Sequence, residues 1–183
     1  MALKATIFKA ELAVADIDRG YYADHALTLA RHPSETDERL MVRVLAYGLN
    51  ASASLAFGSG LSNEDEPDLW EKDLTGSIDL WIDVGLPDEK EVRRACGRAR
   101  DVKVYTYGGR AAALWWEGAR DRLERPKNLT VIDLPLESTR ALAALAQRNM
   151  RLQCNVQEGL VWVGDGAATV QIEPVLVRAP RDF

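Results

Sequence analysis

The alternation of apolar and polar residues predicts most of the strands. The clearest run is residues 77–85, SIDLWIDVG, where apolar side chains recur at every second position, as on a strand with one buried face. Residues 3–14 also alternate, and residues 21–31 return beside them as a second strand. Further strands are predicted at 55–57, 68–73, 102–107, 111–116 and 129–134, with a last hairpin within 151–178.

Three helices are predicted where apolar residues recur at spacings of three and four. Residues 35–50 follow Pro33-Ser34 and place leucine, methionine and valine side chains on one face. Residues 88–100 follow Pro87, carry acids in the first turn and end in arginines, which suits the helix dipole. A third helix is predicted at residues 137–149.

Composition favours one soluble α/β domain that spans residues 1–183. Apolar residues make up 47% of the chain and charged residues 28%, which is ordinary for a protein with a buried core. Two cysteines and two histidines outside any cluster argue against a structural zinc site. Because neither a signal peptide nor a long apolar run is present, we expect a cytoplasmic protein that does not bind membranes. The net charge of -5 argues against a DNA-coating role, although an enzyme with a small basic rim fits it.

Two aspartates, Asp68 and Asp83, are candidates for a functional site. Alternation places Asp79 and Asp83 on one face of the strand 77–85, but ~13 Å apart at ~3.3 Å per residue, so one ion cannot bind both directly. Asp83 is therefore paired with Asp68 on the neighbouring strand. An acid flanked by apolar residues within a strand needs a polar partner, which favours a function for Asp83. Asp68 also has a structural interpretation, as the residue that starts a strand after proline.

Glu38 is the third candidate acid. It lies three and seven residues before Met41 and Leu45, near the buried edge of the helix 35–50. The alternative interpretation is a first-turn acid that the helix dipole stabilises.

The order of elements across residues 35–108 is helix, three strands, helix and strand. With Pro67-Asp68 and Asp83-Val84-Gly85, it resembles the core of the PD-(D/E)XK nuclease superfamily. The chain also resembles the YaeQ family of bacterial proteins. That likeness covers most of the first 110 residues and rests on MALKATIFKA (1–10), LARHPSETDER (29–39), DEPDLW (65–70), IDLWIDVGLPDE (78–89), ACGRA (95–99) and YTYGGR (105–110). The resemblance implies a restriction-endonuclease-like αβββαβ core whose mixed sheet is extended by N- and C-terminal β-strands, and a function that is unassigned.

The nuclease resemblance implies hydrolysis of phosphodiester bonds in nucleic acid. Mg²⁺ or Mn²⁺ would be held by Asp68, Asp83 and Glu38, where it positions a water and shields charge on the phosphate. The superfamily pattern also has a lysine two residues after the second acid, where this chain has Gly85.

The helix after Gly85 carries the candidates to replace that lysine. They are Lys90, Arg93, Arg94 and Arg98, with Lys90 and Arg94 the candidate catalytic groups; Lys90, Arg94 and Arg98 form a stripe at a spacing of four. Lys72, on the strand that follows Asp68, is a further possible replacement. The alternative interpretation of the stripe is a solvated face. The alternative function is a nuclease-like domain that no longer cleaves and binds a protein or nucleic-acid partner, which Gly85 and the acidic net charge favour.

Overall fold

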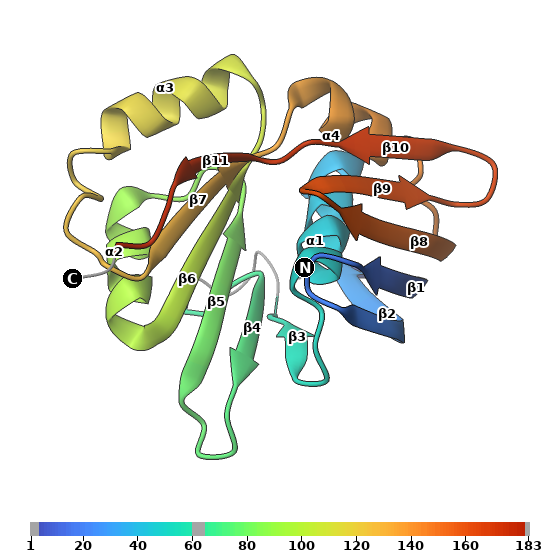
Figure 1. The fold of residues 1–183 in the computed structure, drawn as a ribbon, viewed down its shortest axis with the longest axis horizontal. Coiled ribbons are helices and arrows are strands. Elements are labelled where there is room, and N and C mark those ends of the chain that lie inside the picture. Colours follow the sequence, from blue (N-terminus) through green and yellow to red (C-terminus); the bar gives the residue numbers. More distant parts are fainter. Residues whose placement is uncertain (1–3, 60–64, 182–183) are drawn as a thin grey trace.

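The computed structural model describes residues 4–59 and 65–181, which form eleven strands and four helices in two mixed sheets (Figure 1). The strands are β1 (Thr6–Asp16), β2 (Tyr21–Arg31), β3 (Leu55–Phe57), β4 (Leu69–Lys72), β5 (Ile78–Val84), β6 (Ala99–Thr106), β7 (Leu129–Asp133), β8 (Asn149–Gln157), β9 (Leu160–Gly164), β10 (Thr169–Ile172) and β11 (Val175–Arg178). The helices are α1 (Asp37–Asn50), α2 (Glu89–Arg98), α3 (Arg110–Ala119) and α4 (Leu136–Ala143).

The six-stranded sheet, in the order β11-β7-β6-β5-β4-β3, positions the candidate acids. Its strands β3, β4 and β5 are antiparallel neighbours, whereas β5, β6 and β7 run parallel. The elements from α1 to β6 therefore follow the helix, three strands, helix and strand that the sequence predicted. On β5, Ile82 and Val84 pack in the cluster that contains α1, whereas Trp81 packs with α2. Asp83 shares the α2 side with Trp81, as strand alternation requires.

The N-terminal strands β1 and β2 lie in the second sheet, so the prediction that they extend the sheet of the nuclease-like core is wrong. The five-stranded sheet has the order β10-β9-β8-β1-β2, with β1 parallel to β8. Only β11 extends the six-stranded sheet, where it pairs antiparallel with β7. The predicted C-terminal hairpin is present as β8–β9, which turns at Gly159, and β9–β10 follows it in the same sheet, so only β11 departs to the other sheet.

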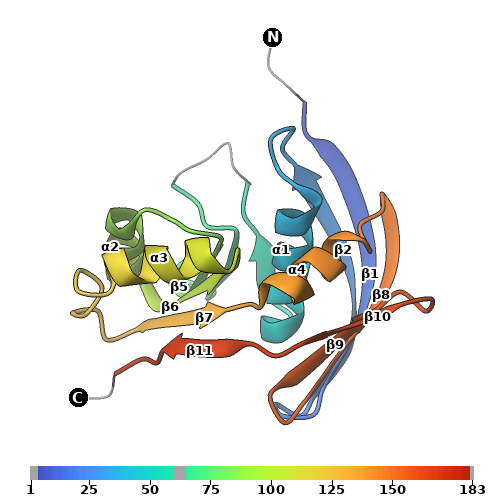
Figure 2. The ribbon, with the colours of Figure 1, turned by 90° about the horizontal axis from the view of Figure 1, so that it is seen from above.

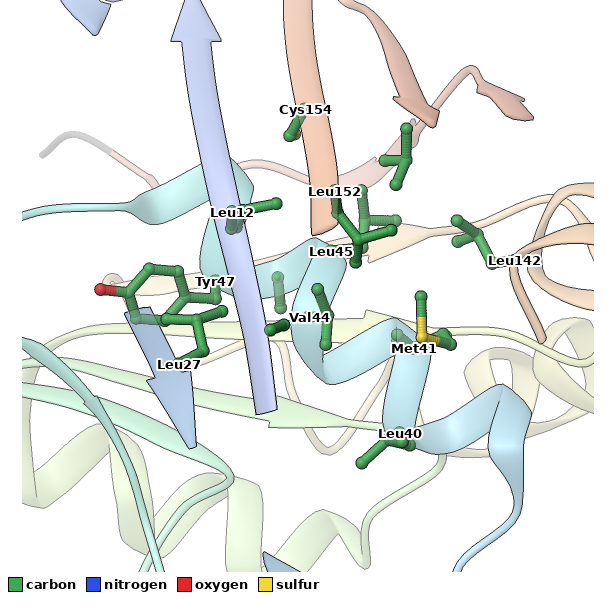
Figure 3. Close-up of a cluster of buried hydrophobic side chains, with 14 of the residues drawn as sticks. Leu12, Leu27, Leu40, Met41, Val44, Leu45, Tyr47, Leu142, Leu152 and Cys154 are labelled. Atoms are coloured by element: carbon green, nitrogen blue, oxygen red, sulfur yellow. The ribbon is translucent and has the colours of Figure 1, made fainter. Parts of the chain in front are cut away.

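The burial of α1 explains why two sheets are needed. Ten of its fourteen residues are buried, and a helix that is buried on every side needs cover on two sides. Figure 2 shows α1 between the two sheets, with α2 and α3 over the opposite face of the six-stranded sheet. Figure 3 shows Val44 and Leu45 of α1 facing Leu12 of β1 and Leu152 of β8.

Two other elements differ from the sequence-based prediction. The predicted strand 111–116 is the helix α3, because the run AAALWW lacks alternation and alanine and leucine favour a helix. The predicted helix 137–149 ends at Ala143, since residues from Asn149 onward pair with β1 in the five-stranded sheet. None of the helices in the described part of the chain is long and apolar enough to cross a lipid bilayer.

Candidate functional site

A cavity of about 390 Å³ lies where β4, β5 and α2 meet. Four acids contribute to its lining: Asp68 directly before β4, Asp83 near the end of β5, and the glutamates Glu66 and Glu91. Helix α2 contributes Arg94 and Arg98, and helix α1 contributes Arg39. The other lining residues are Trp81, Val84, Gly85, Leu86, Pro87, Ala95 and Tyr107. The cavity therefore combines carboxylates with three guanidinium groups.

Asp68 is buried, and both of its carboxylate oxygens accept hydrogen bonds. Arg39 Nη2 donates to Oδ1 at 2.7 Å, and the backbone N–H of Val84 donates to Oδ2 at 2.8 Å. The second bond crosses from β4 to the end of β5, so the strand pairing itself fixes the carboxylate. Each oxygen keeps a further lone pair for another ligand.

Asp83 lies beside Asp68. Its Oδ2 accepts a hydrogen bond from Trp81 Nε1 at 2.9 Å, and its Oδ1 faces the backbone N–H of Asp68 at 3.4 Å. Burial, and after it the negative charge of Asp68, raises the pKa of Asp83 from 3.8 to about 6. A buried carboxylate with few donors has a high affinity for protons or for cations, because either one neutralises its charge.

Arg39 is part of a row of alternating charges that begins inside the protein. Glu35 Oε2 accepts from Arg39 Nη1 at 2.6 Å, and Glu35 also binds the guanidinium of Arg43 at 2.5 and 3.0 Å. Arg43 is 1% exposed and Glu35 3%, so buried polar groups satisfy one another there. The row ends at Asp68, on the floor of the cavity.

Arg39 was not predicted from the sequence, although a signal for it is present. Glu35, Arg39 and Arg43 follow one another at a spacing of four, which places them on one face of α1. Arg43 stands between Val42 and Val44, and a charge in so apolar a helix requires a partner. The pattern predicts paired charges at a buried face, but not that the row reaches Asp68 from another element.

Glu38 is hydrogen-bonded to α4 and does not line the cavity of the acid pair. Its Oε2 accepts a hydrogen bond from Thr139 Oγ1 of α4 at 3.0 Å, and Glu38 is absent from the residues that line the cavity. Packing of α1 against α4 thus directs this side chain to the helix pair. Its place in a metal site stays a prediction from the sequence.

The stripe of basic residues on α2 divides between two hollows. Arg94 and Arg98 line the cavity with the aspartates, and the Arg98 guanidinium carbon lies 5.1 Å from the centroid of the Trp81 ring. Arg98 also donates to the backbone oxygen of Asp65 at 3.2 Å. Lys90 instead lines a separate hollow beside α3. Two of the three basic residues of the stripe, Arg94 and Arg98, therefore line the same cavity as the two aspartates.

Gly85 has a backbone conformation that favours glycine. Its φ is 98°, and its N–H donates to the Tyr105 oxygen at 2.8 Å directly after the end of β5. A Cβ at this position would meet no atom within 4 Å, so space alone does not exclude a side chain. Any L-residue, lysine included, would however be strained at this φ. The backbone conformation, and not the space around it, is therefore what favours glycine at position 85.

The two aspartates fit a magnesium or manganese ion. Both ions prefer oxygen ligands, and Mg²⁺ keeps several waters. Two carboxylates beside a cavity with room for water molecules are therefore a suitable set of donors. Within residues 4–59 and 65–181, no group of three or more histidine, cysteine or acidic side chains is arranged to hold a metal. The ion would therefore be held by Asp68, Asp83 and water.

Comparison with known proteins gives consistent matches over nearly the whole chain. A model of the YaeQ protein family matches residues 1–174. "Uncharacterized protein YaeQ" of Salmonella typhi is 46% identical over 180 residues, which are 98% of this chain and 99% of the relative. The protein of the same name from Escherichia coli K12 is 44% identical with the same coverage.

Two solved structures have the same fold. The crystal structure of YaeQ protein from Xanthomonas axonopodis pv. citri has a TM-score of 0.93 and 53% identity, and covers 96% of this chain and 99% of its own. The crystal structure of YaeQ protein from Pseudomonas syringae has a TM-score of 0.92 and 34% identity, with coverage of 97% and 98%.

Proposed function

The chain belongs to the YaeQ family, and we propose that it is a PD-(D/E)XK nuclease-like protein that hydrolyses phosphodiester bonds with a divalent cation held by Asp68 and Asp83. The observation that carries the proposal is the meeting of these two carboxylates, from adjacent strands, in a cavity whose wall carries arginines. The order α1-β3-β4-β5-α2-β6 supports it, because it matches the order of elements in the restriction-endonuclease-like core.

Each part of the site has a role in this reaction. A bound Mg²⁺ supplies an activated water and shields negative charge on the phosphate. Asp68 and Asp83 hold the ion, and the strand hydrogen bonds to Asp68 and the Trp81 bond to Asp83 fix their orientation. Arg94 and Arg98, which line the same cavity, bind phosphate oxygens, since guanidinium groups form paired, charge-assisted hydrogen bonds with phosphate.

The size of the cavity favours a single strand or a strand end as substrate. A volume of about 390 Å³ is within the range of small-ligand sites and suits one nucleotide unit. A duplex contacts a longer basic surface through many phosphates. The net charge of -5 does not favour a basic surface of that length. Single-stranded DNA and RNA are therefore the first substrates to assay.

A second candidate function is a nuclease-like domain that binds nucleic acid or a protein partner without cleaving it. The specific observation in its favour is Gly85, whose φ of 98° disfavours a lysine at the position where the superfamily has one. If the protein does cleave, an arginine has to take the role of that lysine.

The experiment begins with titration calorimetry of Mn²⁺ into the wild type, Asp83→Ala and Asp79→Asn at low salt. Asp79 is the matched control, because it lies on the same strand but not in the cavity. We expect binding in the wild type and the control and its loss in Asp83→Ala. Unchanged binding in Asp83→Ala would show that the ion binds elsewhere.

A cleavage assay then separates the two functions. End-labelled single-stranded and double-stranded DNA and RNA are incubated with wild type or Asp83→Ala in the presence of Mn²⁺. Cleavage by the wild type that Asp83→Ala abolishes supports the nuclease. Mn²⁺ binding without cleavage of any of these substrates favours the binding module.

A further inference from the structure

One guanidinium group already neutralises an acid of the candidate metal site. Arg39 Nη2 lies 2.7 Å from Asp68 Oδ1, and the Arg39 side chain is 16% exposed at the wall of the cavity. A hydrogen-bonded contact between a guanidinium and a carboxylate with this little solvent is stronger than a surface ion pair. One lone pair of Oδ1 is therefore directed at a cation that the chain itself provides, and the other is left for a further ligand.

The position of Arg39 is fixed from behind. Glu35 binds both Arg39 and Arg43, and the Glu35–Arg43 contact at 2.5 Å is almost fully buried. Because Arg43 neutralises Glu35, the charge of Arg39 acts mainly on Asp68. The two arginines and the two acids of the row cancel, which leaves the charge of Asp83 without a counter-cation in the row.

From this geometry we propose that Arg39 is an internal cation that competes with divalent metal for Asp68, and so controls how the site is loaded. The inference rests on the metal site proposed above. A divalent ion held by Asp68 and Asp83 would meet the positive charge of Arg39, which already donates to the Asp68 carboxylate. Withdrawal of that charge raises the affinity for metal. An incoming phosphate that attracts Arg39 would have the same effect, since Arg39 lines the cavity.

The test is titration calorimetry of Mn²⁺ alone into the full-length wild type and four variants at pH 7.5 and low salt. Arg39→Met removes the charge and the donors, Arg39→Gln removes only the charge, and Arg39→Lys keeps the charge. Arg93→Met is the control, because it removes an arginine that pairs with Glu89 on α2 outside the cavity. Far-ultraviolet circular dichroism and a thermal melt establish that each variant is folded.

We expect Arg39→Met and Arg39→Gln to bind Mn²⁺ about tenfold more tightly or better than the wild type, and Arg39→Lys and Arg93→Met to stay near the wild type. A residue that only maintained the shape of the site would weaken binding when replaced, which is the opposite direction. If the neutral variants bind Mn²⁺ no more tightly than the wild type, the proposal is overturned.

The same titration separates this inference from the proposed function. Binding by Arg39→Gln but not by the wild type would support Arg39 as the competing cation and remove the metal from the wild-type reaction. Should Arg39→Met unfold, the comparison of Arg39→Gln with Arg39→Lys decides the question, because these two differ in charge and both keep a donor for Asp68.

Discussion

Asp83 carries a charge that the folded protein disfavours, so we expect Asp83→Asn to stabilise the metal-free protein at pH 8. Burial and the nearby Asp68 raise the pKa of Asp83 from 3.8 to about 6. Below pH 3.8 Asp83 is protonated in both the folded and the unfolded state, and its titration does not affect stability. Between pH 3.8 and about pH 6 the unfolded state loses the Asp83 proton while the folded state keeps it, so the free energy of unfolding falls as pH rises. Above pH 6 the full cost is present.

The size of the effect follows from the pKa. A shift of about two units at ~1.4 kcal/mol each corresponds to about 3 kcal/mol as an upper limit. Asparagine keeps an oxygen for the Trp81 N–H and has no charge to bury. For a chain of this length, 1 kcal/mol moves Tm by about 2–4 °C, so the melting temperature of Asp83→Asn should rise by several degrees at pH 8.

The assay is urea denaturation of the wild type, Asp83→Asn and Asp79→Asn in the presence of a chelator at pH 4 and pH 8. Asp79→Asn controls for the loss of an acid on the same strand outside the cavity. Asp83→Asn should be the more stable protein at pH 8 and nearly equal to the wild type at pH 4. A variant that is less stable than the wild type at pH 8 would refute the reasoning. So would a stability difference that is the same at both pH values.

Three further substitutions test the packing described above, each by urea denaturation. Gly48→Ala should cost about 1–3 kcal/mol, because a Cβ would lie 2.9 Å from Cys154 Sγ. Adding Cys154→Ala to this variant should restore part of the lost stability. Gly97→Ala is the control and should not destabilise the protein, because the space around its Cβ is open. Arg43→Met should cost up to about 3–5 kcal/mol, since Glu35 loses its fully buried partner and keeps only Arg39; a loss below 1 kcal/mol contradicts this. Gly85→Ala should cost about 1–2 kcal/mol through its positive φ, and a neutral result would show that the turn relaxes.

Local periodicity explains which elements could be predicted from the sequence. Strand β5 and helix α1 have strong and different periods, and their predicted ranges agree with the structure to within a few residues. Residues 111–116 have neither period clearly, and there helix propensity decided the structure. The parallel pairing of β1 with β8 joins residues about 140 positions apart, and no local pattern encodes such a pairing.

In the candidate site, too, local patterns could be predicted and contacts between distant elements could not. Alternation on β5 and the neighbouring strand led to the pair Asp68 and Asp83, which the structure places side by side in one cavity; their role stays a proposal. The direction of Glu38 toward Thr139 depends on how α4 packs, which the sequence did not reveal. Arg39 was missed because its partner Asp68 is 29 residues away on another element.

The pairing of β1 with β8 also constrains the order of events during synthesis. On the ribosome, the β1–β2 hairpin and α1 emerge more than 90 residues before β8, which begins at Asn149. Until then one edge of β1 has no hydrogen-bonding partner, and one apolar side of α1 has incomplete cover. Unpaired strand edges and exposed apolar surface are the features that promote aggregation and attract chaperones. The nascent chain is therefore most vulnerable during translation of its middle third, the part that carries Asp68 and Asp83.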